Sequence, residues 1–281
     1  MIAPVAIGDH VVHLGEVPTT MDVALALGRD GAPSGTVVVA DHQTSGRGRL
    51  DRRWDAPPGS SLLASVLLRT RLSPAKLTSF SLVLGMEIAP VLDGWLPDPC
   101  RLKWPNDLLA GDRKLGGILV RSLPDRKPVG DDSPVTLVIA GIGINVAAGR
   151  DDLPAGATSL REEGDGSVTV ADVAARLWPA LDLAWRRFEG NGGNVDLGGW
   201  RDRAAYVDEE VEISLPGGVR CGILRGVDPT GALCLEDESG MTHVYLTGDV
   251  SRGPIPVPSG ATRTTRHGPR TRREEHRAGT G

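Results

Sequence analysis

The stretch "CRLKWPNDLLAGDRKLGGILVRS", residues 100–122, has the pattern of short strands joined by tight turns. The runs "RLKW", "LLA" and "KLGGILV" are strand-like, "PND" is a turn, and Gly111-Asp112 stands where a tight hairpin turn belongs. The continuous apolar run "VTLVIAGIGINV" (135–146) follows, as a central strand requires. This part of the chain therefore predicts consecutive hairpins beside the central strand of a sheet.

The sequence before these hairpins predicts two further strands and two helices. "TVVVA" (36–40) and "SLLASVLLR" (61–69) are rich in β-branched and aliphatic residues. Thr19 or Thr20 can cap a helix in "MDVALALGRDG", which Gly31 ends. Ser73 and Pro74 open a second helix, which extends through "AKLTSFSLVLGMEIAPVLDGWL" and is kinked at Pro90.

After the central strand, the sequence predicts helices first and then, from residue 207, short strands. Thr169 can cap a helix in "VADVAARLWPALDLAWRRFEG", and another helix is expected around residues 195–206. From residue 207, short alternating strands are separated by "LPGG", "DPTG" and "DESG", which is typical of a small β-barrel. The predicted fold is α+β: a larger domain at 1–206 with a mixed sheet and flanking helices, a β domain at 207–251, and a disordered basic tail at 252–281.

Charge is distributed unevenly along the 281 residues. The net charge is −5, but in the predicted tail seven arginines against two glutamates give +5, which leaves −10 for the rest. An acidic body argues against broad nucleic-acid binding. The basic stretch "HQTSGRGRLDRRW" (42–54) therefore stands out as a local feature.

The cysteines and the hydropathy pattern indicate a reduced, cytoplasmic protein. Cys100, Cys221 and Cys234 are odd in number and scattered, without the spacing of a disulfide framework or a zinc site. The N-terminus lacks an export signal, and no run approaches 18 apolar residues. We therefore expect neither secretion nor a membrane span.

Each polar motif has a structural interpretation beside a functional one. The glycines and arginines of residues 46–53 suit a phosphate or carboxylate, but RNA-binding segments and solvated loops have the same composition. "KWPND" reads most simply as a turn above a buried aromatic residue, and "GIGIN" as a packed strand whose glycines admit a neighbouring helix. On a regular strand Lys114 and Gly116 share a side, with Gly117 between sides.

Several enzyme classes are excluded by missing motifs. The six histidines accompany no nucleophile pattern and no G-x-S-x-G occurs, which argues against a hydrolase triad. The chain also lacks a Walker A sequence and a dinucleotide fingerprint.

The motifs gain specificity from their order. "TTMD", "HQTSGRGR", "KWPNDLL", "DRKLGGILV" and "GIGINV", followed by a small β domain, resemble biotin protein ligases over about residues 10–250. The resemblance implies a catalytic domain like those of class II aminoacyl-tRNA synthetases and biotin ligases, with an SH3-like C-terminal barrel. It also implies that the chain makes biotinyl-5'-AMP from biotin and ATP with Mg²⁺, then transfers biotin to a lysine of the biotin carboxyl carrier domain of acyl-CoA carboxylases.

The resemblance assigns roles to individual residues. Lys114, Arg47 and Arg49 match catalytic positions, and Asp107 is the candidate Mg²⁺ ligand. The implied biotin contacts are Thr19, Thr20, Met21, Gln43, Arg47, Gly48, Arg49, Lys114, Gly116 and Gly117. The implied ATP contacts are Arg49, Trp54, Asn106, Asp107, Lys114 and Asn145.

Three departures from the family pattern stand out. Met21 replaces the asparagine of the usual Ser-Thr-Asn, which removes a polar group, and Asp51 stands where a glycine is common. Only about ten residues precede the first strand, so we expect no N-terminal DNA-binding domain, and a ligase that is not a repressor.

Two alternatives to biotin ligation remain open at this level. One is a lipoate-type protein ligase, related in fold and reaction. The other is a non-enzymatic nucleic-acid-binding protein that uses the arginine segment and the basic tail. Membrane partners are not expected, and the resemblance leaves open whether the chain forms a homodimer.

Overall fold

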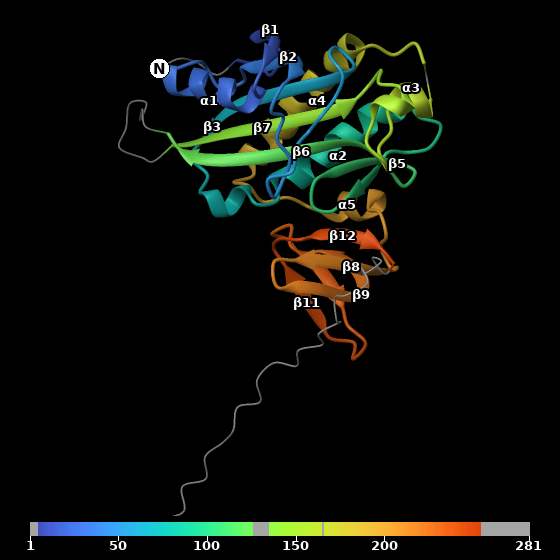
Figure 1. Cartoon of the computed structure of the whole chain (residues 1–281). Helices are drawn as coiled ribbons and strands as arrows, with labels where there is room; N and C mark the ends of the chain where they lie inside the picture. Colours follow the sequence, from blue (N-terminus) through green and yellow to red (C-terminus); the bar gives the residue numbers. More distant parts are fainter. Residues whose placement is uncertain (1–4, 126–134, 165, 254–281) are drawn as a thin grey trace, which may run out of the picture.

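A seven-stranded mixed sheet forms the framework of the larger domain (Figure 1). The computed structural model describes residues 5–125, 135–164 and 166–253. The strand order is β1-β2-β3-β7-β6-β5-β4, in which β1 and β2 are parallel and the other neighbours antiparallel. The strands are β1 (Val11–Val17), β2 (Val37–Gln43), β3 (Ser61–Thr70), β4 (Arg101–Lys103), β5 (Asp107–Ala110), β6 (Arg113–Pro124) and β7 (Thr136–Asn145).

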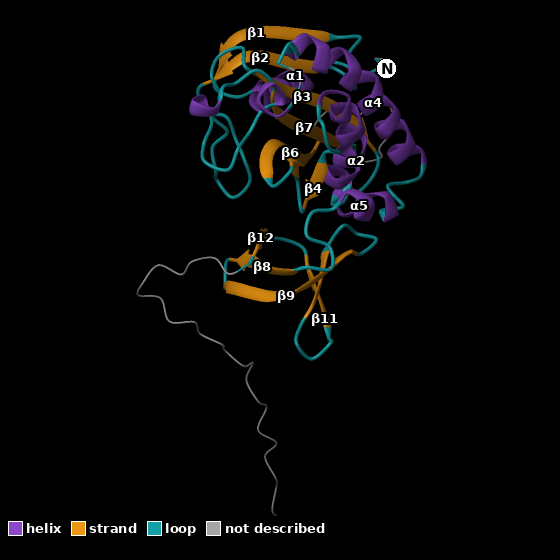
Figure 2. Ribbon diagram, turned by 90° about the vertical axis from the view of Figure 1, so that its right-hand side faces the viewer, coloured by secondary structure: helices purple, strands orange, loops and turns teal. Residues whose placement is uncertain are grey.

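Strand β7 is central, as its apolar run predicts. Its side chains point alternately to the two faces of the sheet, where they join two separate core clusters. Val138 and Ile142 belong to the large cluster that packs against helices α2 (Phe80–Leu92) and α4 (Val170–Gly190). Leu137 and Ile139 point the other way, into a smaller cluster beneath α1 (Thr20–Asp30). Figure 2 shows α2 and α4 together on one side of the sheet. The other face is thus free for α1 and a binding site.

Helix α1 begins and ends where the sequence predicts. The Thr19 hydroxyl accepts a hydrogen bond from the backbone N–H of Met21, and Gly31 takes the left-handed conformation, with φ at 101°. Thr169 likewise caps α4 through a capping box with Asp172. These two helices are therefore fixed largely by local chemistry.

The expectation of one long helix from residue 73, kinked at Pro90, is wrong. A 3-10 turn (Pro74–Leu77) precedes α2, and Pro90 lies within α2 one turn from its end. A second 3-10 turn (Asp93–Trp95) follows. The stretch Pro74–Trp95 is apolar and long enough to span a membrane, but 56% of its most apolar window is buried inside the protein. Burial of Phe80, Leu84 and Ile88 explains the hydrophobicity as core packing.

Shorter elements complete the larger domain. The helix expected around residues 195–206 is only six residues long, α5 (Gly198–Arg203), with Trp200 buried beneath it. A 3-10 turn (Arg150–Asp152) and helix α3 (Leu160–Glu163) lie between β7 and α4.

The C-terminal part forms an antiparallel five-stranded sheet of order β11-β10-β9-β8-β12. Arg252, the first residue of the predicted tail, pairs with Val211 at the end of β12, and Gly253 is the last residue that the structure describes. The rest of the predicted tail, residues 254–281, lies outside the described residues. The strands are β8 (Glu210–Leu215), β9 (Gly218–Val227), β10 (Leu233–Glu236), β11 (Thr242–Tyr245) and β12 (Asp249–Arg252).

The two parts are joined by specific contacts near the β4–β5 edge. The buried Trp104 donates its indole N–H to the Gly231 carbonyl at 2.9 Å, and Arg252 pairs with Asp112 at 3.0 Å. Trp104 is thus the buried aromatic residue that "KWPND" predicts, but it binds the C-terminal sheet. In Figures 1 and 2 that sheet lies beneath this edge, with β12 nearest to it.

The cysteines allow a test of the packing. Cys100 is buried, and burial, followed by the nearby Asp93 carboxylate, raises the pKa of its thiol to about 12, whereas Cys221 is exposed. Because thiolates are the reactive species, we expect a thiol reagent at pH 8 to label Cys221 rapidly and Cys100 only after denaturation. Peptide mapping of the labelled protein measures both rates, and rapid labelling of native Cys100 would contradict this packing.

Candidate functional site

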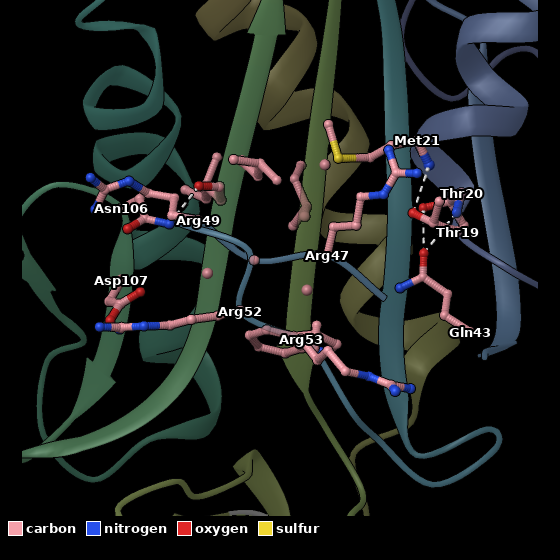
Figure 3. A pocket seen from close by; sticks show the side chains of 18 of the residues that line it. Thr19, Thr20, Met21, Gln43, Arg47, Arg49, Arg52, Arg53, Asn106 and Asp107 are labelled. Atoms are coloured by element: carbon pink, nitrogen blue, oxygen red, sulfur yellow. Dashed lines mark hydrogen bonds between the residues drawn. The ribbon is translucent and has the colours of Figure 1, made fainter. Parts of the chain in front are cut away.

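A pocket lies on the sheet face opposite α2 and α4, beneath the loop that joins β2 to β3. We call this loop, residues 44–60, the arginine loop. Figure 3 shows the threonines and Gln43 at one end of the pocket and Asn106 and Asp107 at the other, with Arg47 between them. The pocket is lined by Thr19, Thr20, Met21, Gln43, Arg47, Gly48, Arg49, Leu50, Arg52, Arg53, Trp54, Ala64, Asn106, Asp107, Lys114, Gly117, Ile118, Leu119, Gly141, Ile142, Gly143 and Asp249.

A buried polar cluster closes one end of the pocket. The Gln43 Oε1 atom accepts hydrogen bonds from the backbone N–H of Thr20 at 2.7 Å and from its hydroxyl at 3.1 Å. The Thr20 hydroxyl also lies 2.8 Å from that of Ser65 on β3. Since these bonds engage Oε1, they fix the orientation of the amide and leave its NH₂ group as the donor for a ligand.

Glycines on β6 and β7 form the floor of the pocket. A Cβ atom added to Gly143 would lie 2.7 Å from the Trp54 ring, and one at Gly141 would lie 3.0 Å from the Met21 sulfur. These residues share the face of Leu137 and Ile139, but without side chains they expose the strand backbone. Gly141 therefore admits Met21 of helix α1, as the structural interpretation of "GIGIN" predicts, whereas Gly143 admits Trp54 of the arginine loop.

A β-bulge changes which glycine accompanies Lys114. Leu109 pairs with Lys114 but Leu108 pairs with Gly116, so Leu115 is the extra residue. A Cβ at Gly117 would lie 3.6 Å from the Lys114 ammonium, whereas one at Gly116 would lie 2.8 Å from the Gly143 carbonyl oxygen. The prediction that Gly116 shares a side with Lys114 is thus wrong: Gly117 lines the pocket, and Gly116 packs within the sheet.

The arginine loop is folded back by its own backbone. Gly48 donates to the Arg52 carbonyl at 2.7 Å, and Trp54 donates to the Gly46 carbonyl at 3.0 Å. At its tip, Leu50 and Asp51 both have left-handed backbones, with φ at 53° and 57°. This conformation favours glycine, which gives a structural reason for the glycine commonly found at position 51 in the family that the sequence resembles.

Each pocket arginine has a partner within the protein. Arg47 forms a two-point ion pair with Asp22 in the first turn of α1, at 2.9 and 2.6 Å. Arg49 donates to the Gly248 carbonyl at 3.1 Å, and burial lowers the pKa of this guanidinium. Arg52 pairs with Asp249 at 2.6 Å.

Alternating charges connect this loop to β6, and we call them the charge ladder: Arg52, Asp249, Lys103, Asp107 and Lys114. Asp249 lies 3.4 Å from the Lys103 ammonium, which lies 3.8 Å from Asp107, and Asp107 accepts from Lys114 at 2.7 Å. Burial by itself raises the pKa of Asp249, but Lys103 and Arg52 outweigh it, so the pKa is lowered overall. The lowered pKa keeps Asp249 ionised at neutral pH. The ladder contains three basic and two acidic side chains.

Two predicted site residues use their side-chain amides for hydrogen bonds within the protein. Asn145 is buried, and its amide accepts from the Ser61 hydroxyl at 3.3 Å and donates to the Thr158 carbonyl at 2.9 Å. Asn106 lines the pocket, but its NH₂ group donates to the Ile118 carbonyl at 2.8 Å. Both amides are thus engaged in holding backbone around the site.

The Trp54 indole offers a further recognition group. Its ring lies on Gly143 with the Lys114 ammonium 5.7 Å from the ring centroid. Its Nε1 atom is buried and has no hydrogen-bond partner among the residues that the structure describes. Because buried N–H groups are normally paired, this donor is suited to an acceptor supplied by a ligand.

The sequence interpretation assigns no role to five charged residues of the site: Asp22, Arg52, Arg53, Lys103 and Asp249. Arg52 lies in the quoted stretch 42–54, where its charge was visible but no role was assigned. Lys103 precedes the quoted turn and Asp22 closes the quoted "TTMD". Asp249 lies about 200 residues from the arginine loop, and nothing in its local sequence indicates the contact.

Asp107 is the predicted metal ligand. Across residues 5–125, 135–164 and 166–253, no group of three or more His, Cys, Asp or Glu side chains is arranged to hold a metal ion. Mg²⁺, however, commonly uses one or two carboxylates together with substrate phosphates and water. The mostly buried Asp107 carboxylate, beside the cations Lys103 and Lys114, fits that shared type of site.

Comparisons with known proteins agree for both parts of the chain. Residues 15–145 match the Biotin/lipoate A/B protein ligase family, and residues 206–253 match the Biotin protein ligase C terminal domain. A Mycobacterium tuberculosis protein named biotin--[acetyl-CoA-carboxylase] ligase is 34% identical over 252 residues, which cover 86% of this chain and 87% of that protein. The bifunctional ligase/repressor BirA of Salmonella typhimurium is 35% identical over 224 residues, and the match covers 78% of this chain and 67% of BirA.

Solved structures show the same architecture. The biotin protein ligase from Aquifex aeolicus in complex with biotin and ATP superimposes with a TM-score of 0.67 at 28% identity. This match covers 86% of the present chain and 98% of the Aquifex chain. The similarity therefore extends through the sheet, the pocket and the C-terminal domain.

Proposed function

The chain belongs to the biotin protein ligase family, and we propose that it joins biotin to ATP as biotinyl-5'-AMP, then transfers biotin to a carrier protein. In the first step, an oxygen of the biotin carboxylate attacks the α-phosphorus of ATP and pyrophosphate leaves. In the second, a lysine amine of a biotin carboxyl carrier domain attacks the carbonyl carbon, and AMP leaves. The family and its relatives support the ligase reaction, and the lipoate-type alternative is not favoured.

The polar end and the glycine floor suit the bicyclic ring of biotin. Thr20 and Gln43 supply hydrogen-bonding groups for the ureido ring, with Thr19 beside them. The bare backbone at Gly141 and the Met21 side chain provide an apolar surface for the sulfur-containing ring. Met21 thus substitutes packing for the polar contact of the usual asparagine.

The cations at the other end suit the reacting acids. A carboxylate and a triphosphate repel each other, and fixed positive charges lower that repulsion and stabilise the charge on the five-coordinate phosphorus. Lys114 and Arg49 are assigned to the carboxylate and the α-phosphate, with Arg47 and the Gly48 backbone on the biotin side. Trp54 covers the adenosine.

Asp107 would hold Mg²⁺ together with the ATP phosphates. The ion would neutralise charge on the leaving pyrophosphate. Asn145 is assigned a supporting role near the adenine, because its buried amide fixes the Thr158 carbonyl. We also propose that the protein acts in the cytoplasm, in keeping with three free thiols.

One observation carries this proposal: Lys114, Arg49 and Arg52 line the same pocket as the Thr20–Gln43 pair. An RNA-binding surface would present its arginines to solvent, whereas Arg49 is only partly exposed and is directed at the C-terminal domain. The pocket arrangement therefore favours the ligase over the nucleic-acid-binding alternative.

A labelling assay tests the function. We expect purified protein, biotin, α-³²P-labelled ATP and Mg²⁺ to give labelled biotinyl-AMP, and added carrier domain to become biotinylated. EDTA should reduce both products by at least a hundredfold, because the phosphates lose their counter-ion, and added Mg²⁺ should restore them. Lipoate in place of biotin should give little product. Absence of biotinyl-AMP at every Mg²⁺ concentration would refute the proposal.

A further inference from the structure

Two consecutive residues of the C-terminal domain grip the arginine loop. The Gly248 carbonyl accepts a hydrogen bond from Arg49, and the Asp249 carboxylate pairs with Arg52. Arg49 and Arg52 flank the left-handed pair Leu50 and Asp51. The C-terminal contacts therefore hold both sides of the tightest turn in the loop. We call Gly248 and Asp249 the clamp.

The clamp is itself rigidly supported. Gly248 has φ at 145°, and a Cβ atom there would lie 2.6 Å from a side-chain carbon of Ile213, so the backbone is pressed against β8 in a conformation that requires glycine. Asp249 begins β12 and pairs with Ser214. Its carboxylate is mostly buried, with 21% of the side chain exposed.

The clamp acts on cations that face the pocket. Arg49, Arg52 and Asp249 all line the pocket together with Lys114. Asp249 also lies 3.4 Å from Lys103 at the end of β4. The Asp249 carboxylate thus connects Arg52 of the arginine loop to Lys103 of the sheet, in the part of the pocket nearest Asp107.

From these contacts we propose that the clamp positions Arg49 and Arg52 for the ATP phosphates, which makes the C-terminal domain part of the adenylation machinery. Asp249 is then a positioning residue, since it acts through Arg52. The inference rests on the proposed function and adds to it a specific task for a second domain. A flexible loop would have to be ordered when ATP binds, whereas the clamp orders it beforehand.

The same contact is compatible with a second effect of Asp249, and the two effects would change the KM for ATP in opposite directions. The Asp249 carboxylate could compete with phosphates for Arg52, in which case removing its charge would strengthen ATP binding. The Gly248 contact argues against competition, because a neutral carbonyl holding Arg49 beside it can only position the loop. Positioning and competition therefore predict opposite changes in the KM for ATP.

The test compares Asp249→Asn with Asp249→Glu and Glu236→Gln. Glu236 is the matched control, because it pairs with Arg225 in the same domain but on the outer surface. We expect Asp249→Asn to raise the KM for ATP about tenfold or more, on the scale of losing a charged hydrogen bond. The KM for biotin should stay within twofold, Asp249→Glu should recover part of the loss, and Glu236→Gln should match the wild type.

A double-mutant cycle guards against a general folding defect. If Asp249 acts through Arg52, adding Asp249→Asn to Arg52→Gln should change the KM for ATP less than twofold. Full additivity, or an unchanged or lowered KM in Asp249→Asn, would overturn the inference. An inactive wild-type protein would instead overturn the proposed function, so the two failures can be told apart.

Discussion

Replacing Lys114 with alanine lowers the expected rate of biotinyl-AMP formation by about a hundred- to a thousandfold, the usual scale for removing one transition-state donor. The Lys114 ammonium lies next to the backbone of Gly117 and 5.7 Å from the centroid of the Trp54 ring. From this position it can reach both reacting groups. The bulge at Leu115 places it there. Single-turnover measurements with saturating biotin and ATP isolate this chemical step.

Lys76→Ala provides the control for Lys114→Ala. Its ammonium is exposed and bonds to Asn194, away from the pocket. The control should retain the wild-type rate, and both variants should unfold at nearly the wild-type temperature because Lys103 still pairs with Asp107 when Lys114 is removed. A Lys114→Ala rate within tenfold of the wild type would remove Lys114 from its assigned role.

Replacing Gly143 with valine has the second large effect that we expect. Even the Cβ atom would lie 2.7 Å from Trp54, so the indole must leave its place on the floor or the strand must shift. Overpacking of this kind costs about 1–3 kcal/mol. Because the displaced ring would no longer cover the nucleotide, we expect the KM for ATP to rise roughly ten- to a hundredfold at that energetic scale.

The matched control is Gly15→Val on strand β1. A Cβ atom at Gly15 has no neighbour within 4 Å, so this variant introduces the same side chain into a strand without a clash. Steady-state kinetics should give wild-type KM values for Gly15→Val. If Gly143→Val also bound ATP normally, Trp54 could not be the cover of the nucleotide.

Local sequence predicted several elements for reasons that the structure confirms. Thr19 and Gly31 delimit α1 because their side chain and backbone satisfy the helix ends without distant partners. The apolar run of β7 identifies a central strand because both of its faces are buried. The arginine loop was recognisable because glycines and arginines are concentrated between two strands.

Other features depended on packing that no local pattern records. The helix expected from residue 73 divides at Thr78 and Ser79, where Thr78 bonds to the Thr230 carbonyl of the C-terminal domain. Strict alternation along β6 put Gly116 on the same side as Lys114, but one extra residue in the strand reverses the sides of the residues before it. The resemblance implies an ATP contact for Asn145, but its amide is hydrogen-bonded to Ser61 and Thr158 inside the protein.

The sequence by itself was sufficient to identify the family, the order of its motifs along the chain and many of the residues that line the pocket. The reason is that the site requires glycines for close approach and charged side chains at fixed positions, and both are visible as residue types. Only the tertiary structure decided how those charges are connected. Asp22 reaches Arg47, and Gly248 and Asp249 reach Arg49 and Arg52, because chain segments far apart in sequence are brought together by the burial of two hydrophobic cores and the docking of the C-terminal sheet. Such pairings follow from packing, which residue types and spacings do not specify.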